Sequence, residues 1–190
     1  WERALSLNGD DADAWCNLGV ARIEGGDVQA AVDAWQRAIE SDPAHADALD
    51  LLAVSRAQSG RSSEAIALWR RALAARPGHS RSRSNLAGAL HQEAISALSR
   101  SDPGHALVLL DEVVRLDPTD PAGHLFRSDA LRQLGRLRDA FEACQDALRI
   151  APERPEVHHN IGNLLKETGQ NDQAIASYRR AIELGSTHPA

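Results

Sequence analysis

An all-α fold, a right-handed α-α superhelix of about five helix-turn-helix units with a leading half-unit, is predicted by three observations on this 190-residue chain. Pro43, Pro77, Pro118 and Pro152 follow one another at intervals of 34, 41 and 34 residues. Bulky and small residues recur at fixed places between these prolines, with the spacing of one helix face. Glycines recur in the middle of the units. A period of 34 residues with helical punctuation is typical of a solenoid of helix pairs.

Residues typical of turns and helix caps predict where each helix begins and ends. A glycine follows the first helix of four units, where a left-handed backbone is easiest for this residue: Gly26, Gly60, Gly135 and Gly169. Asp27, Ser62 and Asn171 then occupy positions where a side chain can cap the second helix. We therefore expect helices over 12–25, 28–41, 46–59, 62–75, 80–100, 103–116, 121–134, 137–150, 155–168 and 171–184.

These helices group into a single array over residues 1–190. Residues 1–9 are predicted to be the second helix of a truncated unit, because Trp1, Ala4 and Leu7 have the spacing of a later second helix. The five units that follow are expected at 12–45, 46–79, 80–120, 121–154 and 155–188. His188-Pro189-Ala190 is similar to the start of another unit. We expect a segment of a longer array, since neither end has a polar capping helix.

The third unit is seven residues longer than the others. Its second helix keeps the regular spacing, and Asp102-Pro103 supplies a cap and a proline at the first helical position. The extra residues therefore belong to the first helix, Ser80 to about Arg100, which lacks the usual glycine stop. Two interpretations stay open. The extension is a tolerated insertion at an exposed turn, or it is a projecting docking element that carries His91, Gln92, Glu93 and Arg100.

Small and bulky positions recur together in several units. Unit one has Trp15, Leu18 and Gly19 in its first helix and Ala31, Trp35, Ala38 and Pro43 in its second, and the other units repeat the pattern. The chain resembles the tetratricopeptide repeat family, whose pattern these residues follow over essentially the whole length. The resemblance implies close helix packing at the small residues. It also implies a concave groove lined by the first helices.

Composition narrows the classes of partner and site. The net charge of −6 and the aromatic content of 4% argue against nucleic acid, which selects basic stripes with stacking aromatics. No apolar run is long enough for a membrane span. Cys16 and Cys144 are expected to be free thiols, which favours a reducing, cytoplasmic location. Arginine in place of nearly all lysine suggests a GC-rich bacterial genome. The absence of methionine indicates that the true N-terminus is missing.

The groove implied by the resemblance defines the candidate site. Residues beside the packing leucine of each first helix are expected to face it, along with further residues of these helices: Asn17, Asp47, Asp50, Leu51, Arg81, Asn85, Leu125, Phe126, Asp129, His159, Asn160 and Asn163. An asparagine amide offers both donors and an acceptor, which suits a peptide backbone. Asn17, Asn85 and Asn160, and the stretch 159–167, are similar to the repeat arm of O-linked N-acetylglucosamine transferases. Leu51 and Phe126 interrupt this series of asparagines.

Two further alternatives concern single residues of the groove. The asparagines either bind a ligand or satisfy only local hydrogen bonds and water. Leu125 and Phe126 are apolar groove residues that mark a contact site if they are exposed. In the alternative, Phe126 folds inward to compensate for Arg127, which occupies a slot usually filled by leucine.

The predicted function is a non-catalytic scaffold that binds a protein or extended peptide along its concave groove. No catalytic motif, metal-ligand spacing or phosphate-binding glycine loop occurs, so we expect no enzymatic activity, no metal and no cofactor in this segment. Two alternatives remain. The chain is the substrate-recognition arm of a larger bacterial enzyme of glycosyltransferase or sulfotransferase type, or it assembles with itself through its uncapped ends.

Overall fold

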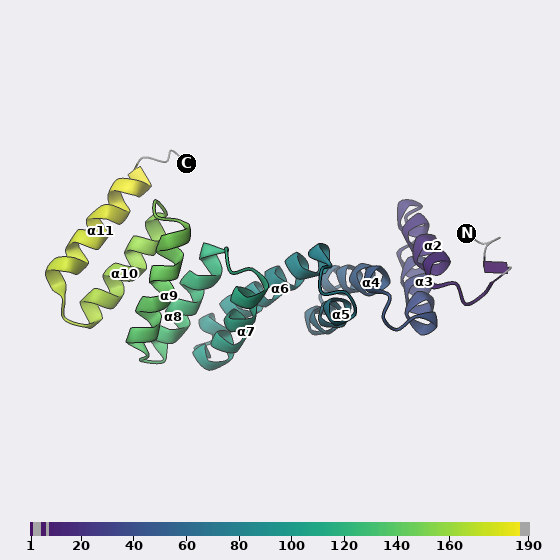
Figure 1. Cartoon of the computed structure of the whole chain (residues 1–190), viewed down its shortest axis with the longest axis horizontal. Helices are drawn as coiled ribbons and strands as arrows, with labels where there is room; N and C mark the ends of the chain where they lie inside the picture. Colours follow the sequence, from purple (N-terminus) through teal and green to yellow (C-terminus); the bar gives the residue numbers. More distant parts are fainter. Residues whose placement is uncertain (2–4, 7, 187–190) are drawn as a thin grey trace. The chain divides into compact units, whose positions relative to one another are not determined.

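The computed structural model describes residues 1, 5–6 and 8–186, and every regular element in this part of the chain is an α-helix (Figure 1). The predicted all-α fold is therefore confirmed. The chain divides into two compact units, residues 1–89 and 90–190, and the boundary between them falls inside helix α6 (Ser80–Ser99).

The first unit is built from two helix pairs and the beginning of α6. Helices α2 (Ala12–Glu24) and α3 (Val28–Ser41) pack together, as do α4 (Ala46–Gln58) and α5 (Ser62–Ala75), and α3 also packs against α4. Trp35 connects the pairs: it is buried in one cluster with Cys16 of α2 and with Ala48 and Leu52 of α4. Each pair thus buries the apolar face that the sequence pattern predicts.

The second unit holds the end of α6 and five complete helices. These are α7 (Pro103–Leu116), α8 (Pro121–Gln133), α9 (Leu137–Ile150), α10 (Pro155–Glu167) and α11 (Asn171–Ser186). Consecutive helices from α7 to α11 pack side by side, and α8 also contacts α10 directly. Helices α8 and α10, which were predicted to line the groove as first helices of successive repeats, are therefore in direct contact.

Helix bounds agree with the sequence-based expectation to within two residues. The four predicted glycines all adopt positive φ, between 74° and 81°. In α6 the equivalent turn is made by Ser101, with φ of 60°, and the same hydrogen-bond pattern closes it, from the Asp102 amide to the Ala97 carbonyl at 2.9 Å. The first helix of the third unit therefore ends in the same left-handed backbone conformation, with serine in place of glycine.

The caps follow the expectation only in part. Asp27 and Asp102 accept hydrogen bonds from backbone amides of α3 and α7, at 3.0 and 3.1 Å. Ser62 and Asn171, which were expected to be caps, are instead the first residues of α5 and α11. The cap position of α5 is Arg61, whose side chain makes no capping bond. These two expectations were wrong by one residue. At the first helical position the Ser62 hydroxyl and the Asn171 amide no longer occupy the cap position.

The long helix α6 packs against its surroundings over its extension. Ala94 and Ala97, which fall in the extended part, are fully buried in the second unit. His91 is half-buried there, and Glu93 lies 3.5 Å from His105 of α7. These contacts argue against an extension that projects freely from the unit.

Two expectations concern the ends. Of the predicted leading helix, Leu5 and Ser6 are helical, whereas Ala4 and Leu7 lie outside the described residues. His188-Pro189-Ala190 also lies outside them. None of the described helices has the length and apolar character that crossing a membrane requires.

Candidate binding groove

The predicted site residues fall into two groups, one in each compact unit. Asn17, Asp47, Asp50, Leu51, Arg81 and Asn85 belong to α2, α4 and α6 of the first unit. Leu125, Phe126, Asp129, His159, Asn160 and Asn163 belong to α8 and α10 of the second. The two groups differ in what their side chains do.

In the first unit Asp50 is the centre of a polar network. Its side chain is 0% exposed, although it was expected to face the groove. It accepts hydrogen bonds from Arg81 Nε at 2.5 Å, the Ser82 hydroxyl at 2.9 Å and Asn85 Nδ2 at 3.2 Å. A buried carboxylate must be paired in this way. Asp50 therefore joins α4 to α6, and it orients Arg81 and Asn85 rather than offering its own oxygens to a ligand.

Asp47 extends this network toward the turn before α6. It pairs with Arg76, and the His79 ring Nε2 lies 3.1 Å from its other oxygen. Burial raises the pKa of Asp47, but the hydrogen bonds from Arg76 and His79 outweigh burial and hold this pKa below its ordinary value. The Asp47 carboxylate thus links α4 to the turn before α6.

An equivalent pair of an aspartate and a turn histidine occurs one repeat earlier. His45 caps α4 by accepting from the Ala48 amide through Nδ1 at 3.2 Å, and its Nε2 lies 3.0 Å from Asp13 of α2. The backbone amide can only donate, so Nδ1 is the acceptor and Nε2 faces the carboxylate. The matching 34-residue spacing of the histidines and of Asp13 and Asp47 was the signal for this pairing.

The remaining two residues of the first group are not brought together. Leu51 is partly buried and packs against the cluster around Trp35. Asn17 is exposed, and no hydrogen bond to its amide is present among the described residues. In this unit the predicted groove residues mainly hold the helices together.

In the second unit the predicted residues converge. Leu125, Phe126 and Asp129 of α8 and His159, Asn160 and Asn163 of α10 all line one hollow of about 420 Å³. Ala122, Arg154 and Glu156 complete its lining, and sequence reasoning did not include these three. We refer to this cavity as the α8/α10 hollow.

The floor of the α8/α10 hollow is apolar. Leu125 is buried with Ala147 and Val157 in a core cluster, so that only its edge reaches the hollow. Phe126 is half-buried, and the His91 ring contacts it edge-on with 4.8 Å between centroids. Arg127 does not need compensation from Phe126, since its Nε donates to Asp111 of α7 at 2.6 Å.

The His91 ring, which packs against Phe126, is poorly hydrated. Burial lowers the pKa of His91, and Asp120, 3.9 Å from its ring, offsets only part of this effect. The imidazole is therefore held toward its neutral form, which favours its packing against an aromatic ring. His91 is a supporting residue that the sequence pattern did not connect with the groove.

The asparagines of α10 are positioned differently from each other. Asn163 Oδ1 accepts a hydrogen bond from the Tyr178 hydroxyl at 2.9 Å, which fixes its amide. Asn160 is half-buried, and its side chain has no hydrogen-bond partner among the described residues. The Asn160 side chain can therefore donate to and accept from a bound chain, whereas part of the acceptor capacity of Asn163 is already used.

The charged groups around the α8/α10 hollow are already paired. Asp129 accepts from Arg132 at 2.6 Å, and Arg132 also donates to Glu167 at 2.8 Å. Arg154 Nε lies 3.2 Å from Glu156. The hollow thus offers neutral amides and apolar surface with little unbalanced charge.

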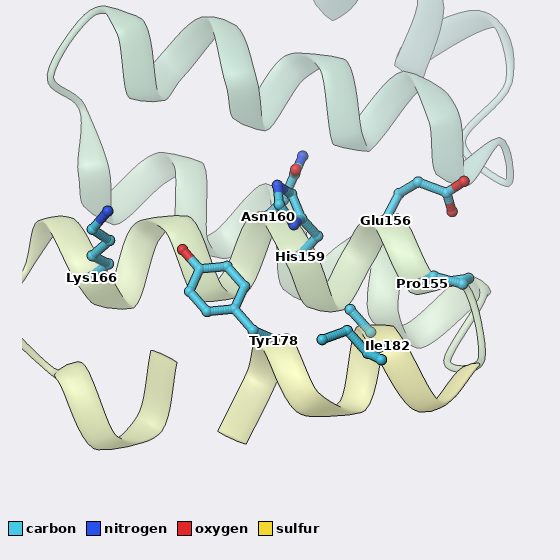
Figure 2. A pocket seen from close by; sticks show the side chains of 8 residues that line it. Pro155, Glu156, His159, Asn160, Lys166, Tyr178 and Ile182 are labelled. Carbon is cyan, nitrogen blue, oxygen red and sulfur yellow. The ribbon is translucent and has the colours of Figure 1, made fainter. Parts of the chain in front are cut away.

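A second hollow lies on the other side of α10, against α11, and we call it the α10/α11 hollow. Its volume is about 670 Å³. It is lined by Pro155, Glu156, His159, Asn160, Lys166, Tyr178, Ala181 and Ile182, seven of which are labelled in Figure 2. Only His159 and Asn160 were predicted to be site residues. The signal for the others was weak, because Tyr178 and Ile182 occupy ordinary packing positions of a second helix.

The described residues hold no group of three or more His, Cys, Asp or Glu side chains with metal-site geometry. Both cysteines are free and buried, and burial raises the pKa of each thiol to about 11. In Cys144 the Ser128 hydroxyl, 3.0 Å away, opposes part of this rise. Thiols of this kind are poor nucleophiles at neutral pH.

Family models account for nearly the whole chain. One model described as tetratricopeptide repeat matches residues 1–46, 16–80, 51–93 and 91–155, and another with the same description matches 131–189. The chain belongs to the tetratricopeptide repeat family. Its fold, helix pairing and small-residue contacts are those that the family pattern implies.

The tetratricopeptide repeat chain is similar to segments of longer proteins. It is 26% identical over 98 residues to small glutamine-rich tetratricopeptide repeat-containing protein 2 of Mycosarcoma maydis, covering 52% of this chain and 28% of that protein. It is 30% identical over 96 residues to the protein O-mannosyl-transferase TMTC1 of Homo sapiens, covering 47% and 11%. The matched region is therefore less than a third of either relative.

Solved structures with the same fold match over almost their full length. MamA 41-end from Desulfovibrio magneticus RS-1 has a TM-score of 0.61 at 18% identity, covering 94% of this chain and 97% of that one. YrrB, described as a tetratricopeptide repeat protein with an unusual peptide-binding site, has a TM-score of 0.66 at 19% identity, covering 98% and 93%. At these identities the likeness establishes the fold.

Proposed function

We propose that this chain is a non-catalytic interaction scaffold that binds a protein or an extended peptide in its groove, with the main contacts at the α8/α10 hollow. The observation that supports this most is the convergence of six residues from two first helices on one hollow. The peptide-binding site described for YrrB, which has the same fold, supports the same use of the fold here.

The proposed mechanism is binding to a groove that is already formed. Tyr178 holds Asn163 in place, and the nearby charges are paired before a ligand arrives. Asn160 supplies a donor and an acceptor to the peptide backbone, which has the same groups in every sequence. Little side-chain ordering is then required, which reduces the entropic cost of binding.

Selection of peptides from a random library on the purified chain, followed by calorimetry, tests this proposal. We expect Asn160→Ala to weaken the Kd of selected peptides by about tenfold, since a hydrogen bond to the backbone is lost. Gln145→Ala is the matched control, because Gln145 is an exposed amide on the second helix α9. Equal Kd values for Asn160→Ala and the unmodified chain, or no binders at all, would contradict the proposal.

A second candidate follows from the relatives, which are much longer than the matched region. One of them is named as an O-mannosyl-transferase, and the chain matches 11% of it. The chain would then be the substrate-recognition arm of a larger enzyme, of glycosyltransferase or sulfotransferase type. In that case Asn160→Ala in the full-length protein would slow transfer to a protein acceptor and leave transfer to a small acceptor unchanged. Equal slowing of both would exclude a recognition role.

A further inference from the structure

The α8/α10 hollow has two walls of different chemistry. Three of the four α8 residues that line it are apolar: Ala122, Leu125 and Phe126. The residues of α10 that line it are all polar: Glu156, His159, Asn160 and Asn163. An extended segment that lies between these walls can therefore direct a side chain to α8 and its backbone to α10.

Phe126 provides most of the apolar surface that a ligand can reach on the α8 wall. Leu125 beside it is only 6% exposed, because it packs in a core cluster with Ala147 and Val157. Among the described residues, Phe126 does not belong to this cluster, and its side chain is half-buried. A ligand in the hollow therefore meets an aromatic ring rather than an aliphatic floor.

The Phe126 ring has one aromatic neighbour already. The His91 ring of α6 lies 4.8 Å from it between centroids, at an angle of 76° between the planes, which is the edge-to-face arrangement that aromatic pairs prefer. Burial lowers the pKa of His91, which favours the neutral ring in this contact. His91 lies outside the lining of the hollow, so this pair leaves the hollow itself open to a second ring.

Packing within the repeat does not explain an aromatic residue at this position. The equivalent residues of the other first helices are Asn17, Leu51, Asn85 and Asn160. Leu51 packs against the cluster around Trp35, and Asn85 donates to Asp50 at 3.2 Å. Since an aliphatic side chain or an amide serves at this position elsewhere, the ring of Phe126 is a feature of this hollow and not of the repeat.

We infer that the ligand is a peptide segment with an aromatic side chain, which packs against Phe126 in the α8/α10 hollow while the Asn160 amide binds the adjacent backbone. This inference rests on the proposed peptide-binding function and names the class of side chain that the site selects. A pair of aromatic rings is more favourable than the same burial of an aliphatic group. Phe126 is then the residue that determines specificity.

Peptides selected from a random library on the purified chain supply the probe. We expect those that bind in an Asn160-dependent way to share one aromatic residue, which is then replaced by alanine or by cyclohexylalanine. Fluorescence anisotropy with the whole chain gives each Kd. Alanine should weaken binding by about tenfold to a hundredfold, because the buried ring is lost. Cyclohexylalanine, which is of similar size but has no π-system, should weaken it by about twofold to tenfold.

The two phenylalanines of the chain provide a matched pair of protein variants. Phe126→Leu should remove the difference in Kd between the aromatic peptide and its cyclohexylalanine form, and Asn160→Ala should still weaken binding in this background. Phe141→Leu makes the same chemical change at a half-buried ring of α9 that lies outside the hollow, and it should keep the difference. Thermal melts verify that both variants fold, and the peptide series on the unmodified chain tests the inference independently of them.

Several results would overturn the inference. Asn160-dependent peptides that share no aromatic residue, or that bind equally well with cyclohexylalanine, would remove the aromatic anchor and leave the proposed function intact. An aromatic preference that persists in Phe126→Leu would do the same. Failure to select any peptide would contradict the proposed function as well. A mass that rises with protein concentration in light scattering, and falls on Phe126→Leu, would assign the hollow to association between copies.

Discussion

Gly19 shows most directly how single residues set the packing of this fold. A Cβ at Gly19 would lie 2.6 Å from Trp35 Cδ1, and one at Gly162 would lie 2.5 Å from Tyr178 Cε1. The small residue of each first helix thus makes room for the large residue of its partner helix. The polar counterpart is Asp50, whose three donors lie between 31 and 35 residues later in the chain.

Gly19→Ala is expected to lower the free energy of unfolding by about 1–3 kcal/mol, because the methyl group overpacks against the Trp35 ring. Gly88→Ala is the matched control. Gly88 also lies in a helix, and a Cβ there would meet nothing within 4 Å beyond the adjacent backbone of its own helix, so that helix propensity should raise stability by about 0.5–1 kcal/mol. Urea unfolding followed by circular dichroism compares the two. A Gly19→Ala chain as stable as the Gly88→Ala chain would refute the packing model.

Asp47 makes stability depend on acid. Its folded pKa lies below the ordinary value of about 3.9, so its stabilising contribution is complete above that pH and is lost as the pH falls through the folded pKa. The difference in melting temperature between the unmodified chain and Asp47→Asn should therefore be constant near neutrality and shrink below about pH 4. Melts from neutral pH down to about pH 3 measure it. A difference that grows on acidification would show that the ionised Asp47 side chain does not stabilise the fold.

At the scale of the element, much of the fold was predictable from the sequence. The 34-residue period and the four glycines located the helices to within two residues, because backbone punctuation is local. Ser62 and Asn171 were wrongly predicted to be helix caps. The sequence pattern looks the same when the cap position moves by one residue, but the side chain then no longer reaches the free backbone amides. The burial of Asp50 was not predictable, since it depends on donors from another helix. The α10/α11 hollow was not predicted, because Ile182 has the sequence signature of a packed residue; its equivalent one repeat earlier, Leu148, packs against the cluster that contains Val157 of α10.

The end of α6 supplies a test at this scale. Ser101 is the one described non-glycine residue with positive φ, a conformation that costs an ordinary residue roughly 1–2 kcal/mol. Ser101→Gly should remove this strain at some cost in chain entropy and raise the free energy of unfolding by about 0.5–1 kcal/mol. Ser101→Ala, which keeps the strain, serves as the control. The interpretation of the turn fails if glycine is no better than alanine in denaturant titrations.

The whole molecule carries one natural reporter in each compact unit, Cys16 in the first and Cys144 in the second. Both thiols are buried with a pKa of about 11, so that roughly one in a thousand is ionised at about pH 8. We expect neither to react with a thiol reagent in the native chain on the timescale of the unfolded control. As urea rises, Cys16, which is slightly exposed, should react before the fully buried Cys144. Rapid native labelling of Cys144 would contradict its place in the core.

The central claim at this scale is that ligands bind the chain on the first-helix side of α8 and α10. Titration of isotopically labelled chain with a library-selected peptide, followed by amide and side-chain NMR shifts, tests it most directly. We predict that the largest shifts include the Asn160 side-chain amide and the backbone around Phe126, with Gln145 on α9 unaffected. Shifts confined to the outer faces of α9 and α11, with Asn160 unchanged, would contradict it.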